Sequence, residues 1–474
     1  MLAASGGALG MVIAWWAGGV LQGLLATDVF PIPISFDFAI DRTVLLFAVA
    51  ASVITALVFG LAPAWSASRP ELVPALKASA EGDERTRFST RDALVLGQVT
   101  LSTVLLVAGA LLARGLAAAQ NTDLGYDPRP LSSLTFNLSM NGYDAARAAA
   151  VQERAIETLR ALPGVESVST TTRLPLSPEI NMDGVRIPGH HSAEEQETPV
   201  DTVAVGADYF RTVGVPIVAG RAFTADDTAQ KRQVLIVNET MARQYWPHGQ
   251  ALGQRVYLGG FHTPAWEIVG IARDHKVRSV GENPRPYLHV PYRSGQTIGL
   301  VVRSATPAAG SLPALRAALW SLEPDIVFTE DVSAEEVAAT TILPTRVGAL
   351  VLGAFGVLAL LLAAIGLYGV VAYSVSRRTR EIGIRMALGA PRAAVLRNLA
   401  SRGALVAVGG LVIGGFAGAA VGRLLESMLY GISSFDGIAF MIAAAVLLGI
   451  TSVANLVPTL SAMRIDPVTA LRSE

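Results

Sequence analysis

The stretch "VLALLLAAIGLYGVVAYSVSRRTREIGIRMALGA" (residues 357–390) places a long apolar run directly before four arginines and one glutamate. The uncharged run begins at residue 347 and ends at residue 376. A membrane helix needs about 20 apolar residues, and the 30 here would form a helix of about 45 Å against a hydrocarbon core of about 30 Å. The stretch therefore predicts a membrane helix with an extension that acts as a stalk, followed by a basic segment. Five glycines within the run favour the alternative of a tilted or broken helix.

The same kind of run recurs along the chain. The sequence is 51% hydrophobic and 16% charged, whereas a soluble protein carries about 25% charged residues. Its mean hydropathy is +0.46. Charged residues are absent from five further runs, at 1–27, 43–68, 93–113, 403–422 and 437–463. We expect six transmembrane helices. The first run lacks the basic start of a secretory signal.

The arginines predict the orientation of these helices. Residues 69–91 and 377–402 and the tail after residue 463 carry Lys and Arg, whereas the short loops 28–41 and 424–436 hold acidic residues only. Because short loops rich in Lys and Arg stay in the cytoplasm, the first three segments are expected inside and the two acidic loops outside. The large segment between the third and fourth helices then lies outside.

That outer segment is expected to be an α+β domain of two lobes. "LSSLTFNLSM" (131–140) alternates as a strand does, and Asp144 can cap the following helix, which stops before the strand "VESVSTTT". A second strand–helix–strand unit is "TIGLVVRS" (297–304), "SLPALRAALWSL" (311–322) and "DIVFTE" (325–330). Between these units, "QVLIVNETMARQYW" and "WEIVGIARD" predict a second, mixed lobe.

An internal repeat links the two ends of the chain. "APAWSASRPELVPALK" (62–77) aligns with "VPTLSAMRIDPVTALR" (457–472), which pairs Pro63 with Pro458 and Arg69 with Arg464. The C-terminal copy has a helix and an arginine loop before its last two helices, and the N-terminal copy begins after the place of that loop. The expectation is that Met1 lies part-way into a first, incomplete unit.

The arginine loop admits two interpretations that the residues alone leave equal. Arginines can simply hold a cytoplasmic loop at the lipid headgroups. Alternatively, a short helix in which Glu381 and Arg385 pair at i and i+4 and which ends at Gly389 docks into a groove on a cytoplasmic partner. Ile382, Met386 and Leu388 would give this helix an apolar edge.

A family resemblance bears on that choice. "RTREIGIRMALGA" after "LAAIGLYGVVAYSVSRR" resembles the signature of the FtsX/macrolide-exporter class of ABC permeases, most closely its duplicated orphan branch. "GADYFRTVGVPIVAGRAF" and "DPVTALR" are similar to the outer domain and tail of that family, and residues 343–474 would be its FtsX-like domain. The resemblance implies that the loop contacts a separate ATP-binding subunit. The implied contact residues are Arg380, Glu381, Ile382, Arg385, Met386 and Gly389.

The sequence lacks the motifs of several enzyme classes. None of its three lysines follows a glycine, so no Walker A loop is present, and no nucleophile elbow or zinc-protease helix is found. Cysteine is absent. His190 and His191 near Glu194 and Glu195 are interpreted as a solvated loop rather than a metal site. We expect no catalytic residue, no cofactor and no nucleic-acid partner.

The sequence thus predicts an α-helical protein of the bacterial inner membrane with one large extracytoplasmic domain, and not an enzyme. The function expected is that of a permease subunit of an ABC-type export or mechanotransmission system. Its partners would be a separate ABC ATPase, membrane lipid, and a second permease copy or a periplasmic adaptor. The alternatives are a membrane signalling or scaffold protein that activates a cell-envelope enzyme, and a non-functional permease fragment.

The expected division of the chain follows from these assignments. It consists of two helices of an incomplete first unit (1–76), a cytoplasmic linker (77–92), a transmembrane helix (93–118), a periplasmic α+β domain (119–342), a long transmembrane and stalk helix (343–376), a cytoplasmic coupling loop (377–400), and two last transmembrane helices with a cytoplasmic tail (401–474).

Overall fold

The computed structural model describes residues 2–25, 41–67, 90–139, 142–190, 197–230, 232–259, 262–377 and 391–462. The chain divides into two compact units, Met1–Ser89 and Thr90–Glu474. The first unit contains helices α1 (Leu2–Leu25) and α2 (Arg42–Ala67), both strongly apolar. These two helices meet where Gly7 faces Ser52, so closely that a Cβ on Gly7 would lie 2.5 Å from the Ser52 hydroxyl oxygen.

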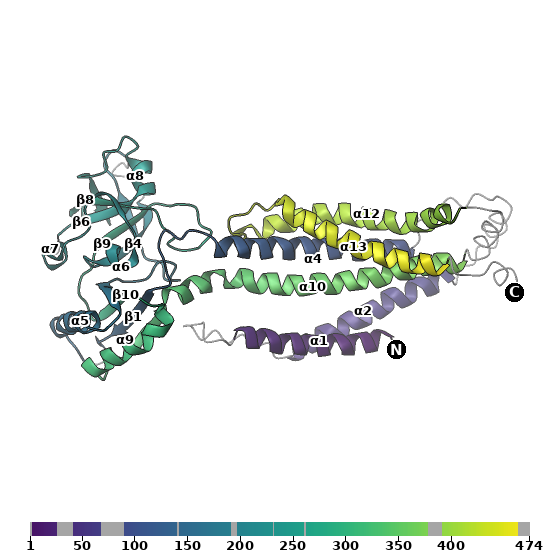
Figure 1. The fold of residues 1–474 in the computed structure, drawn as a ribbon, viewed down its shortest axis with the longest axis horizontal. Helices are drawn as coiled ribbons and strands as arrows, with labels where there is room; N and C mark the ends of the chain where they lie inside the picture. The colour runs from purple at the N-terminus through teal and green to yellow at the C-terminus, as the bar shows by residue number, and fades with distance from the viewer. Residues whose placement is uncertain are drawn as a thin grey trace. The chain divides into compact units, whose positions relative to one another are not determined.

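The second unit contains a bundle of four long helices and an outer α+β domain (Figure 1). The bundle helices are α4 (Thr90–Gln120), α10 (Ala334–Arg377), α12 (Arg392–Leu424) and α13 (Gly437–Ala462). Each is long and apolar enough to cross a membrane. Four of the six predicted spans are therefore present by length and composition.

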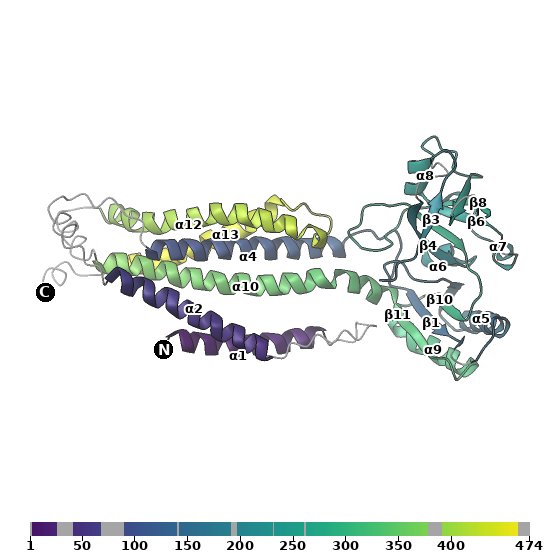
Figure 2. The ribbon, with the colours of Figure 1, turned by 180° about the vertical axis from the view of Figure 1, so that it is seen from behind.

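Glycines let the bundle helices approach one another closely. Gly410, Gly414, Gly418 and Gly422 lie four residues apart on α12 and face Val99, Thr103, Val107 and Leu111 of α4. A Cβ on Gly414 would lie 2.5 Å from the Thr103 Cβ atom. Between α4 and α10, Gly109 lies against the backbone of Gly353. In a membrane, where apolar surface gives no driving force for helix association, such close backbone packing is the main attraction. Figure 2 shows α4, α10 and α12 side by side.

The first lobe of the outer domain has an antiparallel sheet of four strands. The order is β11-β1-β10-β2, with bounds Phe328–Ser333, Leu131–Asn137, Thr297–Ser304 and Val165–Thr170. Helices α5 (Ala145–Arg160) and α9 (Ala308–Leu322) cover one face, and Leu134, Val151 and Leu315 are buried between them. The predicted cap is confirmed, because the Asp144 carboxylate accepts the Arg147 N–H at 2.8 Å.

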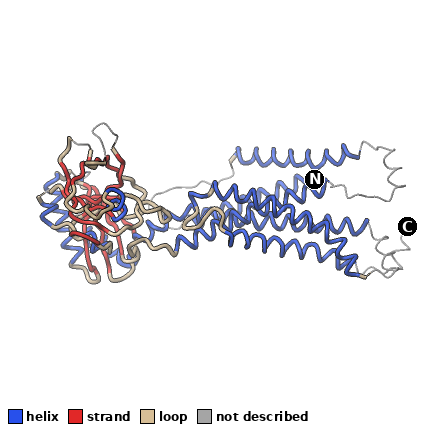
Figure 3. The backbone as a smooth tube through the Cα atoms, turned by 90° about the horizontal axis from the view of Figure 1, so that it is seen from above, coloured by secondary structure: helices blue, strands red, loops and turns tan. Residues whose placement is uncertain are grey.

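The second lobe has a sheet of seven strands in the order β5-β8-β6-β9-β4-β3-β7. Because β8 also pairs with β7, six of these strands form a closed ring, and β5 pairs with β8 outside it. The bounds are Ile217–Gly220 (β5), Ala265–Ala272 (β8), Val234–Asn238 (β6), Tyr287–Pro291 (β9), Thr198–Val205 (β4), Met182–Arg186 (β3) and Arg255–Leu258 (β7). The short helices are α6 (Tyr209–Val213), α7 (Ala225–Ala229) and α8 (Glu239–Tyr245). Figure 3 shows that the strands are confined to the outer domain.

One strand differs from its prediction. The sequence predicts a strand over 325–330, whereas β11 begins at Phe328 and runs to Ser333. The Ile326 carbonyl accepts the Trp320 indole N–H at 3.0 Å, and the Ile326 side chain is buried against α9. These contacts keep the start of the segment out of the sheet.

Candidate functional site: the junction between the helix bundle and the outer domain

The predicted site residues Arg380, Glu381, Ile382, Arg385, Met386 and Gly389 lie outside the described residues. The helices on either side are described, since α10 ends at Arg377 and α12 begins at Arg392. The loop therefore joins the ends of two bundle helices. At the opposite end of α10 the structure shows a second region, the junction, where bundle and outer domain meet.

The outer sheet passes into the bundle without a linker. Strand β11 ends at Ser333 and α10 begins at Ala334. Glu336 accepts hydrogen bonds from both the N–H and the hydroxyl of Ser333, at 2.8 and 2.9 Å, and the Ser333 hydroxyl oxygen accepts the Glu336 N–H at 3.2 Å. This reciprocal cap satisfies backbone donors at the start of the helix. Ala334 and Val337 are buried in the core of the outer domain, so the first turn of α10 belongs to both parts.

A proline lies about two turns beyond Val337 in α10. Pro344 cannot donate a helical hydrogen bond, and a proline inside a helix commonly bends it. The Tyr430 hydroxyl donates to the Thr341 carbonyl at 2.8 Å, and the Thr345 hydroxyl donates to the Met428 carbonyl at 3.0 Å. Both partners lie between α12 and α13. The turn between those helices thus supports α10 on either side of its proline.

The same turn is tied to α4. An ion pair joins Arg114 to Asp436 with 2.9 Å between Nε and Oδ1, and Asp436 also accepts the Ala439 N–H at 2.8 Å as the cap of α13. The Asp436 side chain is 15% exposed and that of Arg114 33%. Exposed ion pairs contribute little stability, but this one fixes where α13 begins relative to α4. The segment 425–436, which we call the outer turn, is therefore held by both α4 and α10.

The outer domain contacts the outer turn through the segment between β8 and β9. A Cβ on Gly281 would lie 2.4 Å from the Tyr430 ring, so only a glycine fits against that ring. In the same segment, the Lys276 N–H donates to the Leu124 carbonyl and the Val277 carbonyl accepts the Leu176 N–H, at 2.9 and 2.8 Å. Residues 273–282, which we call the bridging segment, thus link the second lobe, the end of α4 and the outer turn.

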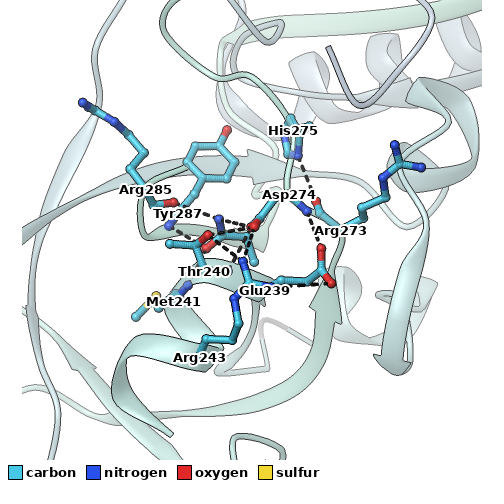
Figure 4. A network of polar contacts seen from close by, with 10 residues as sticks. Glu239, Thr240, Met241, Arg243, Arg273, Asp274, His275, Arg285 and Tyr287 are labelled. Atoms are coloured by element: carbon cyan, nitrogen blue, oxygen red, sulfur yellow. Dashed lines mark hydrogen bonds and ion pairs between the residues drawn. The ribbon is translucent and has the colours of Figure 1, made fainter. Parts of the chain in front are cut away.

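Asp274 anchors the bridging segment to the second lobe (Figure 4). Its carboxylate accepts the N–H and hydroxyl of Thr240 at 2.9 and 2.7 Å, the Asn238 amide at 2.7 Å and the Arg243 guanidinium at 2.7 Å. In return the Glu239 carboxylate accepts the Asp274 N–H at 3.1 Å. Hydrogen bonds to a charged group contribute about 1.5–3 kcal/mol each, so this network makes the start of the bridging segment rigid.

Aromatic and imidazole rings lie behind Asp274. His275 packs edge-on against Tyr287, with 5.5 Å between ring centroids. Burial lowers the pKa of His275 to about 4, although the nearby Asp274 carboxylate acts in the opposite direction. The imidazole is therefore neutral at neutral pH. No group of His, Asp and Glu among the described residues could hold a metal ion, and His190 packs on Tyr245.

The sequence pattern did not indicate this junction. Residues 424–436 entered the sequence argument only through their charge, and the outer domain was expected to end at residue 342. A proline within an apolar helix and a Tyr-Gly pair in a short outer loop were available signals. Their meaning depends on contacts between residues far apart in the chain, such as Thr341 with Tyr430.

Comparisons with known proteins agree with this arrangement. The MacB-like periplasmic core domain family matches residues 1–319, and the FtsX-like permease C-terminal family matches residues 353–467. The chain belongs to the MacB/FtsX family of ABC transporter permeases. The FtsX-like match covers most of α10, the loop after it, α12 and α13.

Relatives of known name fall into two groups. The macrolide export ATP-binding/permease protein MacB of Hahella chejuensis is 26% identical over 334 residues, which cover 67% of this chain and 48% of that protein. The uncharacterized ABC transporter permease YknZ of Bacillus subtilis is 28% identical over 356 residues, which cover 70% of this chain and 81% of that protein. The chain thus spans about half the length of the MacB protein and most of the length of YknZ.

Among solved structures, the periplasmic region of MacB from Actinobacillus actinomycetemcomitans aligns with a TM-score of 0.32 and 17% identity, covering 46% of this chain and 94% of that one.

Proposed function

We propose that this MacB/FtsX-type permease is the membrane subunit of an ABC-type export or mechanotransmission system. It lies in the bacterial inner membrane with its outer domain in the periplasm, and it relays motion that a separate ATPase drives. The lack of a Walker A loop in this sequence supports the need for a separate ATPase. YknZ is described as a permease and MacB as a combined ATP-binding and permease protein for macrolide export, which supports the same division of tasks.

The observation that carries the proposal is the continuity of β11 and α10. Helix α10 has 44 residues and begins directly after a strand of the outer sheet. At 1.5 Å per residue it is about 66 Å long, about twice the thickness of a hydrocarbon core. One element therefore reaches from the buried core of the outer domain to the loop that carries Arg380 and Arg385. A displacement at that loop would be passed on without an intervening flexible linker.

The coupling contact with the ATPase is assigned to Arg380, Glu381, Ile382, Arg385, Met386 and Gly389. The loop joins α10 to α12, and α12 packs on α4 through its glycines, so a push on the loop would act on three bundle helices. Lipid surrounds the bundle, and a second permease copy or a periplasmic adaptor completes the assembly.

The proposal also includes six spans and a two-unit arrangement. Helices α1 and α2 would be the fifth and sixth spans, and they would match α12 and α13 in the repeat that pairs Arg69 with Arg464. In this arrangement the outer domain is 119–342, the stalk helix 343–376 and the coupling loop 377–400, with the duplicated orphan permeases as the related branch.

Co-purification tests the assignment. Tagged chain is isolated from membranes of its host, and ATP hydrolysis by the isolated complex is measured. The double variant Glu381→Arg, Arg385→Glu keeps the net charge and should lower the associated ATPase activity at least tenfold. The matched control is Arg472→Glu, Glu474→Arg in the tail, which should change nothing. Equal ATPase association in both double variants would contradict the docking assignment.

A further inference from the structure

Four polar side chains from separate segments gather in the core of the outer domain next to the bridging segment. They are Arg173 after β2, Tyr209 in α6, His275 after β8 and His289 in β9. The ring centroid of His289 lies 5.9 Å from that of Tyr209 and 5.8 Å from that of His275. Tyr209 and His289 are fully buried, and the Arg173 side chain is 1% exposed. We call these four residues the core cluster. Figure 4 shows its member His275 beside Tyr287.

The core cluster contains buried polar atoms without hydrogen-bond partners among the described residues. They are Nε and Nη2 of Arg173, the hydroxyl of Tyr209, Nε2 of His275 and both ring nitrogens of His289. More than about 90% of buried polar groups in proteins are hydrogen-bonded. A concentration of such atoms at one place indicates that a partner other than the protein belongs there.

The charges of the neighbourhood indicate the sign of that partner. Asp201 is 3% exposed and is the one carboxylate near three guanidinium groups, at 2.9 Å from Arg278, 3.5 Å from Arg285 and 3.7 Å from Arg173. Both of its oxygens are within 3.0 Å of Arg278 Nε. Glu282 pairs with Arg285 at 3.7 Å. In the part of the chain that the structure describes, three guanidinium groups thus share two carboxylates.

His275 and His289 do not change this balance of positive and negative charge. Burial lowers the pKa of His275 to about 4 and that of His289 well below its usual value, and the Arg173 charge acts in the same direction on both. The same charge also lowers the pKa of Tyr209, although burial raises it far more. Asp201, the ion-pair partner of Arg173, lies opposite Tyr287 in the sheet, and the Tyr287 ring packs against His275 and His289. Arg173 is thus close to the rings, and it is the most buried of the three arginines. A buried charge without a hydrogen-bonded counter-ion is strongly unfavourable.

The Nε and Nη2 edge of the Arg173 guanidinium is suited to an anion with two oxygens side by side. Arg173 Nη1 donates to the Glu179 carbonyl at 2.9 Å, whereas Nη2 lies 3.7 Å from the Asp201 carboxylate, so neither Nε nor Nη2 has a hydrogen-bond partner among the described residues. These two nitrogens form one edge of the guanidinium, and such an edge binds two oxygens of a carboxylate or phosphate in parallel. The Tyr209 hydroxyl and the N–H groups of neutral imidazoles are further donors.

We propose that Arg173, Tyr209, His275 and His289 form an internal binding site for a small oxyanion, held at the Nε and Nη2 edge of Arg173. Water alone would satisfy the donors but would leave three guanidinium groups with two carboxylates between them. Because His275 is part of the bridging segment, the bound anion stabilises the junction from inside the outer domain. The inference does not depend on the proposed transport function.

Thermal unfolding of the purified full chain in detergent tests the site. Inorganic phosphate, sulfate and acetate are titrated at constant ionic strength against chloride, and binding is measured in parallel by calorimetry. We expect a saturable rise in unfolding temperature for at least one of the three, with one site per chain, as for any ligand that binds only the folded state.

The decisive variant is Tyr209→Phe, because the Tyr209 hydroxyl has no hydrogen-bond partner among the described residues. If the anion binds, this variant loses a donor and its affinity falls about tenfold. If the site is empty or holds water only, the variant removes an orphan hydroxyl, stability rises in every buffer, and the anions have no effect.

Arg173→Gln should abolish the saturable rise, and the matched control Arg255→Gln, at an exposed arginine of β7, should leave it unchanged. No saturable effect of any of the three anions on the wild-type chain would overturn the proposal. So would an effect of equal size in Tyr209→Phe and the wild type.

Discussion

The helix bundle and the junction share α4 and α10 but are held by different kinds of contact. In the bundle, glycines of α12 lie against Val99, Thr103 and Val107 of α4, and the Ser102 and Thr103 hydroxyls donate to carbonyls of their own helix. At the junction, ion pairs and hydrogen bonds join different elements, as between Arg114 and Asp436. Packing without directional bonds permits small shifts between helices, whereas directional bonds fix positions. This difference favours shifts between helices of the bundle over shifts within the junction.

A fall in pH should have the largest effect, because it should unfold the outer domain before the helix bundle. All six histidines of the sequence lie in the outer domain. Burial lowers the folded-state pKa of His275 to about 4 from 6.5, and that of His289 well below 6.5. Between these values the unfolded chain binds more protons than the folded one, so stability is complete above about pH 6.5 and is lost as pH falls toward 4.

The expected cost is about 1.4 kcal/mol per pH unit for each histidine, over the range between its folded-state and unfolded-state pKa. Tryptophan fluorescence should report opening of the outer domain while the helical circular-dichroism signal of the bundle remains. His289→Gln should roughly halve the slope with pH, and His248→Gln, at an exposed position, should not. If the outer domain and the helix bundle unfold at the same pH, this prediction is wrong.

A side chain at Gly414 should break the bundle. Gly414→Leu would force atoms into Thr103 and the Thr100 carbonyl of α4, where a Cβ alone would already lie 2.5 and 2.8 Å away. Overpacking of this kind costs about 1–3 kcal/mol. We expect a lower unfolding temperature in detergent. Gly415→Leu is the matched control, because nothing lies within 4 Å of a Cβ at that glycine. Equal effects of the two substitutions would show that α12 does not pack on α4 as described.

Removal of one hydroxyl should weaken the junction by a smaller amount. Tyr430→Phe retains the ring against Gly281 but loses the hydrogen bond to the Thr341 carbonyl, at a cost of about 0.5–1.5 kcal/mol. Hydrogen exchange of the amides around Pro344 should become faster. Tyr368→Phe, at an exposed tyrosine of α10, provides the control. Unchanged exchange in Tyr430→Phe would mean that the outer turn does not support the proline.

Features that depend on residues close together in the sequence could be predicted. The Asp144 cap and strands β1 and β10 follow from local patterns, and the four long spans follow from runs without charge. The start of β11 could not be predicted, because the Ile326 carbonyl accepts the hydrogen bond of the Trp320 indole N–H and the strand begins only at Phe328. Closure of the β ring through β7 and β8 depends on strand order, which no local pattern contains.

The candidate sites differ in the same way. The arginine loop is visible in the sequence because its charges are contiguous. The junction is not, since Thr341 and Tyr430 are 89 residues apart and Arg114 and Asp436 are 322 apart. The core cluster is equally hidden, because its four members come from segments that meet only when both lobes have formed.

The position of Pro344 within α10 has a mechanical consequence. From Ala334 to the proline the helix measures about 15 Å, and from the proline to Arg377 about 50 Å. If α10 pivots where the outer turn holds it, it is a lever with a short outer arm and an inner arm about three times as long. A swing at the Arg377 end would reach the outer domain reduced about threefold in distance and increased about threefold in force.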